Sequence, residues 1–274
     1  MTVENKEDTY ILGTGKAASK KLDMQQEILR EGSYKHLEKA GLSEGQVVWD
    51  IGCGGGAMTS YLAKVVGARG RVYAIDKSEE LLEIARAKIK SEGLENVTFI
   101  QGDIRSQKDL SMGTADLIYM RFVLTHVKDP EVVINIGKNL LKDGGVALSQ
   151  EPILSTYYNS SKHEIFREYV KAIADVGKKM GVDYDLGKRL LTLYEQAGYV
   201  ETNVDYNQPQ VKIAYVKETL PLDIAEWKDK AVALGVLTQE KAASWVQTIK
   251  DWPDDDTDSF NLPMLVYTIA RKTK

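Results

Sequence analysis

A strand that runs straight into a cluster of glycines constrains this chain more than any other feature. The stretch VVWDIGCGGGAMT occupies residues 47–59, and the acid Asp50 stands just before the glycines. Its apolar first half indicates a buried strand, and residues 57–66 indicate a helix that Gly67 ends. A strand, a glycine loop and a helix in this order predict a ligand site at the carboxyl end of the strand.

The alternation of strand and helix continues along the next hundred residues. Further apolar strands are indicated at residues 71–76, 96–103, 115–120 and 146–151, with helices at 79–91 and 130–140. This order predicts an α/β fold with a doubly wound, mainly parallel sheet. Ligands of such sheets bind at the carboxyl ends of the strands, where Asp50, Asp76, Asp103 and Arg121 are expected.

Outside this alternation the chain is less regular, and we expect one domain (1–274) with three parts. The parts are an N-terminal helical cap (1–42), a cofactor-binding core (43–151) and a substrate-side region (152–274). In the substrate-side region we expect helices at 160–180 and 186–197, and the last two strands at 200–206 and 265–271. It also holds a helical insertion at about 217–250. We expect Gly32 to interrupt the first helix, which spans 16–42. The insertion, read as starting near Pro221, either packs on the sheet edge or covers the ligand site as a lid.

Composition excludes several classes of function. The net charge of -4 and pI near 5.6 give no bulk attraction to nucleic acid or to an anionic membrane. No apolar run approaches the roughly 20 residues that span a bilayer, and no signal peptide is visible. The single cysteine, Cys53, fits a reducing compartment, so we expect a cytoplasmic protein. We expect no metal, because the acidic run DWPDDDTDS is typical of a solvated loop. Composition does not predict the oligomeric state.

The acid before the glycine loop bears on the ligand. Gly52-x-Gly54-x-x-Ala57 satisfies a relaxed dinucleotide fingerprint, with Asp76 near the place of its ribose acid. Asp50, however, opposes a phosphate and favours a ligand whose near end is cationic, such as the sulfonium of S-adenosylmethionine. It can also accept hydrogen bonds from the loop amides and set the shape of the loop.

Two further acids suit an adenosine group. Asp76 ends its strand and can accept both ribose hydroxyls, while the stem of Lys77 can cover the adenine. The next strand ends in Gly102-Asp103-Ile104, where the carboxylate can accept from the adenine amino group and Ile104 can pack on the ring. The alternative role of each acid is a helix cap or a turn.

Together these motifs resemble the class I S-adenosylmethionine-dependent methyltransferases. The resemblance rests on VVWDIGCGGG, YAID, FIQGDI, DLIYMRFVLTHVKDP and LLKDGG, and it covers residues 47–151 well. It implies a seven-stranded sheet whose last strand is antiparallel. It assigns Gly52, Gly54 and Gly56 to the methionine end and the loop, where Cys53 also lies. It assigns Asp76 to the ribose, and Asp103 and Ile104 to the adenine. Arg121 falls where such proteins contact the methionine moiety through backbone atoms.

The N-terminal segment resembles one branch of the family, which acts on small molecules. Tyr10-Ile-Leu-Gly13 and the later KKLDMQQ carry this similarity, with Lys21 in place of the usual arginine. The resemblance implies that Tyr10 and Gln25 reach over the cofactor as part of a cap. The alternative is a structural helix with Gln25 facing solvent.

The sequence predicts methyl transfer from S-adenosylmethionine, giving S-adenosylhomocysteine, to an O, N, S or C nucleophile of a small molecule. His126 is the candidate catalytic base, and its alternative role is to cap or pack the next helix. His36 and His163 are interpreted as surface or packing residues. Glu151 is a second candidate near the substrate, and Tyr157 and Tyr158 can form an aromatic wall. Two other functions stay open: a non-catalytic protein that binds S-adenosylmethionine or S-adenosylhomocysteine, and an NAD-linked oxidoreductase.

Overall fold

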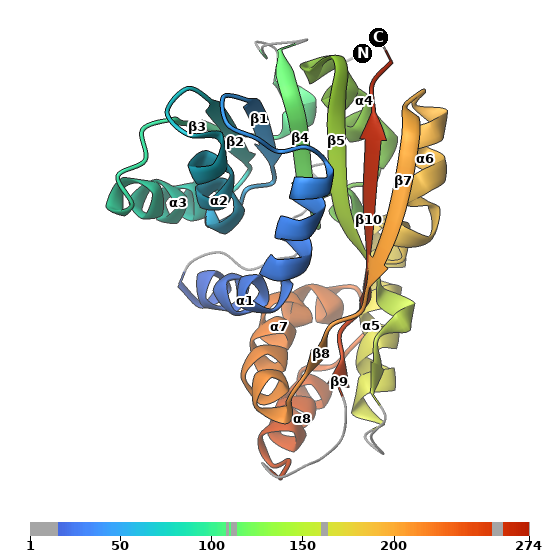
Figure 1. The fold of residues 1–274 in the computed structure, drawn as a ribbon. Coiled ribbons are helices and arrows are strands. Elements are labelled where there is room, and N and C mark those ends of the chain that lie inside the picture. Colours follow the sequence, from blue (N-terminus) through green and yellow to red (C-terminus); the bar gives the residue numbers. More distant parts are fainter. Residues whose placement is uncertain (1–15, 108–109, 111–113, 160–163, 254–259, 274) are drawn as a thin grey trace, which may run out of the picture.

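Seven strands form the central sheet of the computed structural model, which describes residues 16–107, 110, 114–159, 164–253 and 260–273 (Figure 1). The strands are β1 (Val47–Ile51), β2 (Arg71–Asp76), β3 (Val97–Gln101), β4 (Ala115–Arg121), β5 (Leu141–Ile153), β7 (Val200–Asn207) and β10 (Met264–Arg271). Their order is β3-β2-β1-β4-β5-β10-β7. The first five pair in parallel, and β10 runs antiparallel to both of its neighbours. The expected sheet with its reversed last strand is confirmed.

Helices cover both faces of this sheet because alternate strand residues point to opposite sides. Val48 packs with α1 (Lys16–Lys39) and α2 (Ala57–Val66), and α3 (Glu79–Ser91) lies on the same face. The next residue, Trp49, packs on the other face with α4 (Pro130–Leu140) and α6 (Leu190–Gln196). The short 3-10 turns are Ile104–Ser106, Leu124–His126, Leu154–Thr156 and Leu186–Arg189.

Helix α1 does not break at Gly32, contrary to the sequence prediction. It is continuous from Lys16 to Lys39. A Cβ at Gly32 would lie 2.6 Å from the Tyr267 hydroxyl, so this glycine lets the helix approach β10 closely. One turn on, the His36 ring stacks on Tyr267 with centroids 3.8 Å apart, which confirms a packing role for His36. His163 lies outside the described residues.

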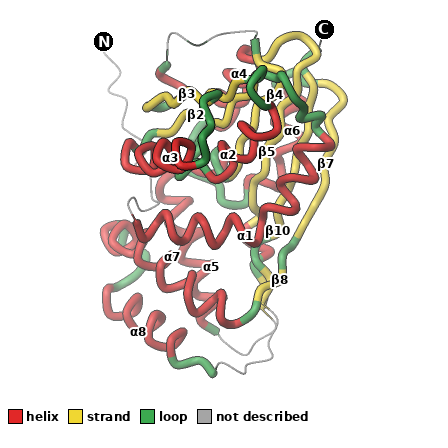
Figure 2. The backbone as a smooth tube through the Cα atoms, turned by 60° about the vertical axis from the view of Figure 1, so that its left-hand side comes forward, coloured by secondary structure: helices red, strands yellow, loops and turns green. Residues whose placement is uncertain are grey.

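A second layer of helices lies beyond the carboxyl edge of the sheet, with α1 between the two layers (Figures 1 and 2). It contains α5 (Ile165–Met180), α7 (Ile213–Ala233), α8 (Gln239–Lys250) and a small sheet of β6 (Tyr158–Asn159), β9 (Phe260–Asn261) and β8 (Gln210–Val211). These elements share their own core, which includes Phe166, Trp245, Trp252 and Phe260. None of the described helices has the length and hydropathy of a membrane span.

The predicted boundaries of the insertion were wrong. It consists of two helices, and the first begins at Ile213, with Pro221 inside it. Helix α7 packs against α1, α5 and α8, so it belongs to the second layer of helices. The predicted alternative in which the insertion packs on the sheet edge was therefore wrong. The strands of the small sheet were not predicted, because two residues are too few for a periodic pattern.

Candidate functional site

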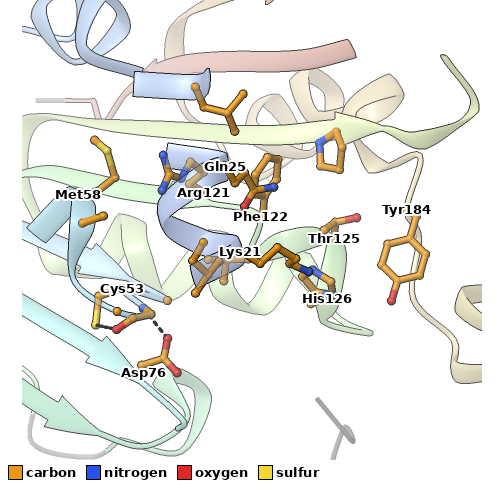
Figure 3. A pocket seen from close by; sticks show the side chains of 18 of the residues that line it. Lys21, Gln25, Cys53, Met58, Asp76, Arg121, Phe122, Thr125, His126 and Tyr184 are labelled. Carbon is orange, nitrogen blue, oxygen red and sulfur yellow. Dashed lines mark hydrogen bonds between the residues drawn. The ribbon is translucent and has the colours of Figure 1, made fainter. Parts of the chain in front are cut away.

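A cavity of about 370 Å³ lies between the carboxyl ends of β1, β2 and β4 and the second layer of helices (Figure 3). One end is formed by the glycine loop and the acids that follow the strands. The other end is formed by side chains of α5 and α7, and α1 lies along one wall. The sequence-predicted residues that line it are Gln25, Asp50, Gly52, Cys53, Gly54, Asp76, Lys77, Gly102, Asp103, Ile104, Arg121 and His126. Tyr10 lies outside the described residues.

Backbone amides of the glycine loop donate hydrogen bonds to other groups of the protein. The amides of Gly52 and Cys53 donate to the Ile75 carbonyl at 2.8 and 3.1 Å. The Gly54 amide donates to Asp76 Oδ2 at 2.8 Å (Figure 3). Because these donors are already bonded, they are not free to hold a pyrophosphate, which needs free amides. The loop therefore fits a ligand without phosphate better than a dinucleotide.

Two glycines of the loop, Gly52 and Gly56, both have a positive φ and lie against different neighbours. Gly52 has a φ of 73°, and a Cβ there would lie 2.5 Å from Val123 Cγ2. Gly56 does not line the cavity, contrary to its predicted role at the methionine end. A Cβ on Gly56 would lie 2.8 Å from the Ala85 side chain, so it permits close packing of α2 on α3. Gly55 lines the cavity instead.

Asp50 is buried and accepts a hydrogen bond from the Thr59 hydroxyl at 2.6 Å. Burial raises the pKa of Asp50 to about 6, against the lowering effects of Thr59 and the Arg121 charge. The sequence interpretation that Asp50 accepts loop amides was wrong for Gly54, whose amide is bonded to Asp76. Asp50 thus adds negative charge beneath the loop, but it does not set the shape of the loop through a bond to the Gly54 amide.

The two acids that were predicted to bind adenosine are held differently. Asp76 accepts from Gly54 through Oδ2 and from the Ser78 amide through Oδ1 at 2.9 Å. A carboxylate has about four acceptor positions, so Asp76 keeps some capacity to accept from a ligand. Partial burial would raise the pKa of Asp103, but hydrogen bonds from Arg105 and Lys77 hold it well below its usual range. Lys77 Nζ lies 2.9 Å from Asp103 Oδ2, so both residues form part of the same wall.

Helix α1 places side chains over the glycine loop. A Cβ at Gly54 would lie 3.6 Å from Leu22 Cδ1, and Gln25 lines the cavity from the same face of the helix. This position contradicts the alternative in which Gln25 faces solvent. The next residue, Gln26, accepts a hydrogen bond from Arg121 Nη1 at 2.6 Å. The Arg121 side chain therefore ties the end of β4 to α1.

Glu151 has a role that the sequence did not reveal. It does not line the cavity but is fully buried beneath the turn that follows β4. Its carboxylate accepts the amides of Val123 and Leu124 at Oε1, and that of Thr125 at Oε2, at 2.9–3.1 Å. Burial raises the pKa of Glu151, and the three amides oppose that rise. Glu151 therefore fixes the turn that carries His126.

His126 lies in the cavity wall, edge-on to Tyr184 with ring centroids 5.5 Å apart. Figure 3 shows the Lys21 side chain extending toward it. Burial and the nearby Lys21 charge lower the pKa of His126 to about 4. The imidazole is therefore neutral at pH 7 and can accept a hydrogen bond, but it is a weak base.

The lowered pKa of His126 predicts that the folded protein loses stability as the pH falls. The unfolded chain binds a proton near pH 6.5, whereas the folded chain does so near pH 4. The unfolded state therefore binds more protons as the pH falls, and stability is lost. Between pH 7.5 and 5 the free energy of unfolding of the natural chain should fall by about 1–2 kcal/mol more than that of His126→Phe. Urea unfolding at several pH values measures this, and parallel pH dependences would contradict it.

The far end of the cavity was mostly missed by sequence reasoning. Tyr157 lines it, as the expected aromatic wall requires, whereas the side chain of Tyr158 is not described. Helix α7 adds Tyr215, Thr219, Asp223 and Trp227. Their i, i+4 spacing was a readable signal, because it places all four on one helix face.

Cys53 is a buried thiol beside two acids. Burial raises the pKa of the Cys53 thiol, and the negative charges of Asp50 and Asp76 raise it further. Cys53 is therefore a poor nucleophile. Among the residues that the structure describes, no group of His, Cys, Asp and Glu has the arrangement of a metal site.

Comparison with known proteins identifies the family. Residues 42–198 match the family described as a methyltransferase domain. The chain belongs to this methyltransferase family. The class predicted from the sequence, its fold and its S-adenosylmethionine cofactor are thereby confirmed.

Several relatives are similar in sequence to part of this chain. A protein of Streptomyces fradiae, known as the uncharacterized 37.1 kDa protein in transposon TN4556, is 29% identical over 224 residues, or 81% of this chain and 63% of that protein. The demethylmenaquinone methyltransferase of Lactococcus lactis is 28% identical over 178 residues, or 61% of this chain and 70% of that protein. The chain thus spans less than two thirds of the first relative.

Solved structures share the fold at low identity. A Bacillus halodurans C-125 protein, whose name assigns it to the methyltransferases, has a TM-score of 0.59 and 20% identity, over 88% of this chain and 98% of that chain. Phosphoethanolamine N-methyltransferase 2 of Haemonchus contortus, solved with S-adenosyl-L-methionine, has a TM-score of 0.53 and 18% identity, over 93% of this chain and 53% of that chain.

Proposed function

We propose that this protein transfers the methyl group of S-adenosylmethionine to a small molecule that binds at the far end of the same cavity. The observation that carries the proposal is the continuity of the cavity. One space reaches from Asp76 and Asp103 to Tyr157 and Asp223. Donor and acceptor can therefore meet without crossing solvent, which alignment for an in-line displacement requires.

The residues at the glycine end fit the donor. Bound there, S-adenosylmethionine supplies a methyl group on a cationic sulfur. Asp76 has lone pairs for the ribose hydroxyls, and Asp103 and Ile104 form the adenine wall. Asp50 and the glycine loop lie at the methionine end, beneath Leu22 and Gln25 of α1. The carboxylates of Asp50 and Asp76 lie nearby and favour a positively charged ligand.

The other functions considered from the sequence have less support. An NAD-linked oxidoreductase requires a phosphate cradle, and the amides of Gly52, Cys53 and Gly54 are already bonded. A non-catalytic binder has no need of a second chamber beyond the donor. His126 is neutral at pH 7 and lines the cavity, so its imidazole can accept a hydrogen bond from a methyl acceptor.

A carbon acceptor of the quinone type is a second candidate. The relatives named demethylmenaquinone methyltransferases favour it. The match to the Lactococcus lactis enzyme covers 61% of this chain, so the acceptor of that enzyme does not pass to this protein on similarity alone.

Transfer of labelled methyl groups tests the proposed function. The protein is incubated with S-adenosylmethionine labelled in its methyl group and with either a small-molecule extract or demethylmenaquinone. We expect label in a small molecule, with transfer lost in Asp76→Asn. Tight binding of S-adenosylhomocysteine without transfer to any fraction would favour the non-catalytic binder, and tighter binding of NAD would favour the oxidoreductase.

A further inference from the structure

The far end of the cavity is an aromatic chamber, formed by Tyr157, Tyr169, Tyr184, Tyr215 and Trp227. The Tyr169 ring lies 5.8 Å from that of Trp227 and 6.2 Å from that of Tyr157, measured between centroids. Burial raises the pKa of these tyrosines, that of Tyr215 to about 12, so their hydroxyls stay protonated. The chamber therefore offers ring faces and neutral hydroxyl groups to an acceptor.

One carboxylate, that of Asp223, lines this chamber. Its Oδ1 lies 2.7 Å from Lys21 Nζ, and its Oδ2 accepts a hydrogen bond from the Tyr169 hydroxyl. Its side chain is still 29% exposed, compared with 12% for Lys21. A carboxylate has about four acceptor positions, so Asp223 retains capacity for a ligand donor.

Asp223 shares the Lys21 ammonium with a second carboxylate. Lys21 also pairs with Glu226, whose side chain is 9% exposed and does not line the cavity. Burial alone would lower the pKa of Lys21, but the two carboxylates raise it, so Lys21 is protonated. The Lys21 ammonium is therefore shared between two carboxylates, and of these only Asp223 lines the cavity. His126 is neutral at pH 7 and adds no positive charge there.

We propose that the methyl acceptor carries a basic amine, which binds in the aromatic chamber with its positive charge toward Asp223. This inference rests on the proposed function and names its acceptor class. Aromatic faces attract a cation through their quadrupole, and a carboxylate adds a charge-assisted hydrogen bond. An anionic acceptor would instead meet the partly exposed Asp223 carboxylate.

The chemistry of such an acceptor balances in atoms and electrons. The ammonium first loses one proton to solvent. The nitrogen lone pair then forms the new bond to the methyl carbon as the carbon–sulfur bond breaks, and that electron pair stays on sulfur. The products are a methylated ammonium, S-adenosylhomocysteine and one released proton.

A purely structural role for the ion pairs is the main competing explanation. Lys21 lies on α1 and its partners lie on α7, so the pairs also join the two helices. Asp223 and Glu226 both contact Lys21, but only Asp223 lines the cavity. Glu226→Gln is therefore a matched control for Asp223→Asn, because both remove one carboxylate charge from Lys21.

Binding of three isosteric probes tests the inference. Phenethylamine, 2-phenylethanol and phenylacetate are titrated into the natural protein by calorimetry, with S-adenosylhomocysteine saturating. We expect phenethylamine to bind at least about tenfold more tightly than 2-phenylethanol, and phenylacetate to bind most weakly. Asp223→Asn should lose this preference, and Glu226→Gln should keep it.

Several results would overturn the amine acceptor. These are equal or weaker binding of phenethylamine than of 2-phenylethanol, no binding of any probe, or a preference that survives Asp223→Asn. An equal loss in both variants would assign the ion pairs to helix joining alone. The comparison of probes on the natural protein decides the question even where a variant fails to fold. Failure of S-adenosylhomocysteine to bind is a separate result, and it would refute the proposed function.

Discussion

Asp76→Asn is expected to lower the affinity for S-adenosylhomocysteine by about 100-fold, or about 2.7 kcal/mol. Two losses combine. The neutral amide accepts ribose hydroxyls less well than a carboxylate, and one charge-assisted bond contributes about 1.5–3 kcal/mol. Asparagine also has one acceptor oxygen in place of two, so the amides of Gly54 and Ser78 no longer both find a partner. Titration calorimetry measures the affinity.

Two variants serve as controls for Asp76→Asn. Asp103→Asn should lower the affinity less, because Lys77 and Arg105 already share its carboxylate. Asp143→Asn, at a side chain that is 73% exposed, should leave it unchanged. An Asp76→Asn variant that binds S-adenosylhomocysteine like the natural protein would remove Asp76 from the site.

Although glutamine has nearly the same shape as glutamate, Glu151→Gln is expected to destabilise the fold by about 2–3 kcal/mol. The glutamine oxygen can replace Oε1 and keep the amides of Val123 and Leu124. Its NH₂ group then faces the Thr125 amide, and a buried amide without an acceptor costs about 1–3 kcal/mol. Tm should fall by roughly 5–10 °C. Cofactor affinity should fall as well, because Val123 on this turn packs against Gly52.

The matched control for Glu151→Gln is Glu44→Gln, at an exposed side chain that pairs with Arg69. It should change Tm by less than about 1 °C, since exposed ion pairs contribute little. If Glu151→Gln unfolds at the same temperature as the natural protein, Glu151 does not hold the turn.

The core of the fold was predictable because local signals and tertiary packing agree there. Helix α2 ends at Val66, before Gly67, and Ser78 caps α3 by accepting from the Leu81 amide. Gly32 is the instructive exception. Its helix-breaking tendency is weak, about 1 kcal/mol, and the contact with Tyr267 across the helix–sheet interface outweighs it.

The end of the cavity at the glycine loop was also predictable, because strand ends and a glycine loop lie close together in the chain. The end formed by α5 and α7 was not. Lys21 and Asp223 are separated by 202 positions, so only the folded chain shows that they meet. Glu151 looked like a substrate residue because it ends a strand, but its carboxylate points beneath the turn that follows β4.

A crystal structure with bound S-adenosylhomocysteine tests the central claim most directly. The ribose hydroxyls should lie within hydrogen-bond distance of Asp76, the adenine beside Asp103 and Ile104, and the sulfur should face the aromatic chamber. An adenosine group bound away from Asp76 and Asp103, or a sulfur that points away from Tyr157 and Asp223, would contradict it.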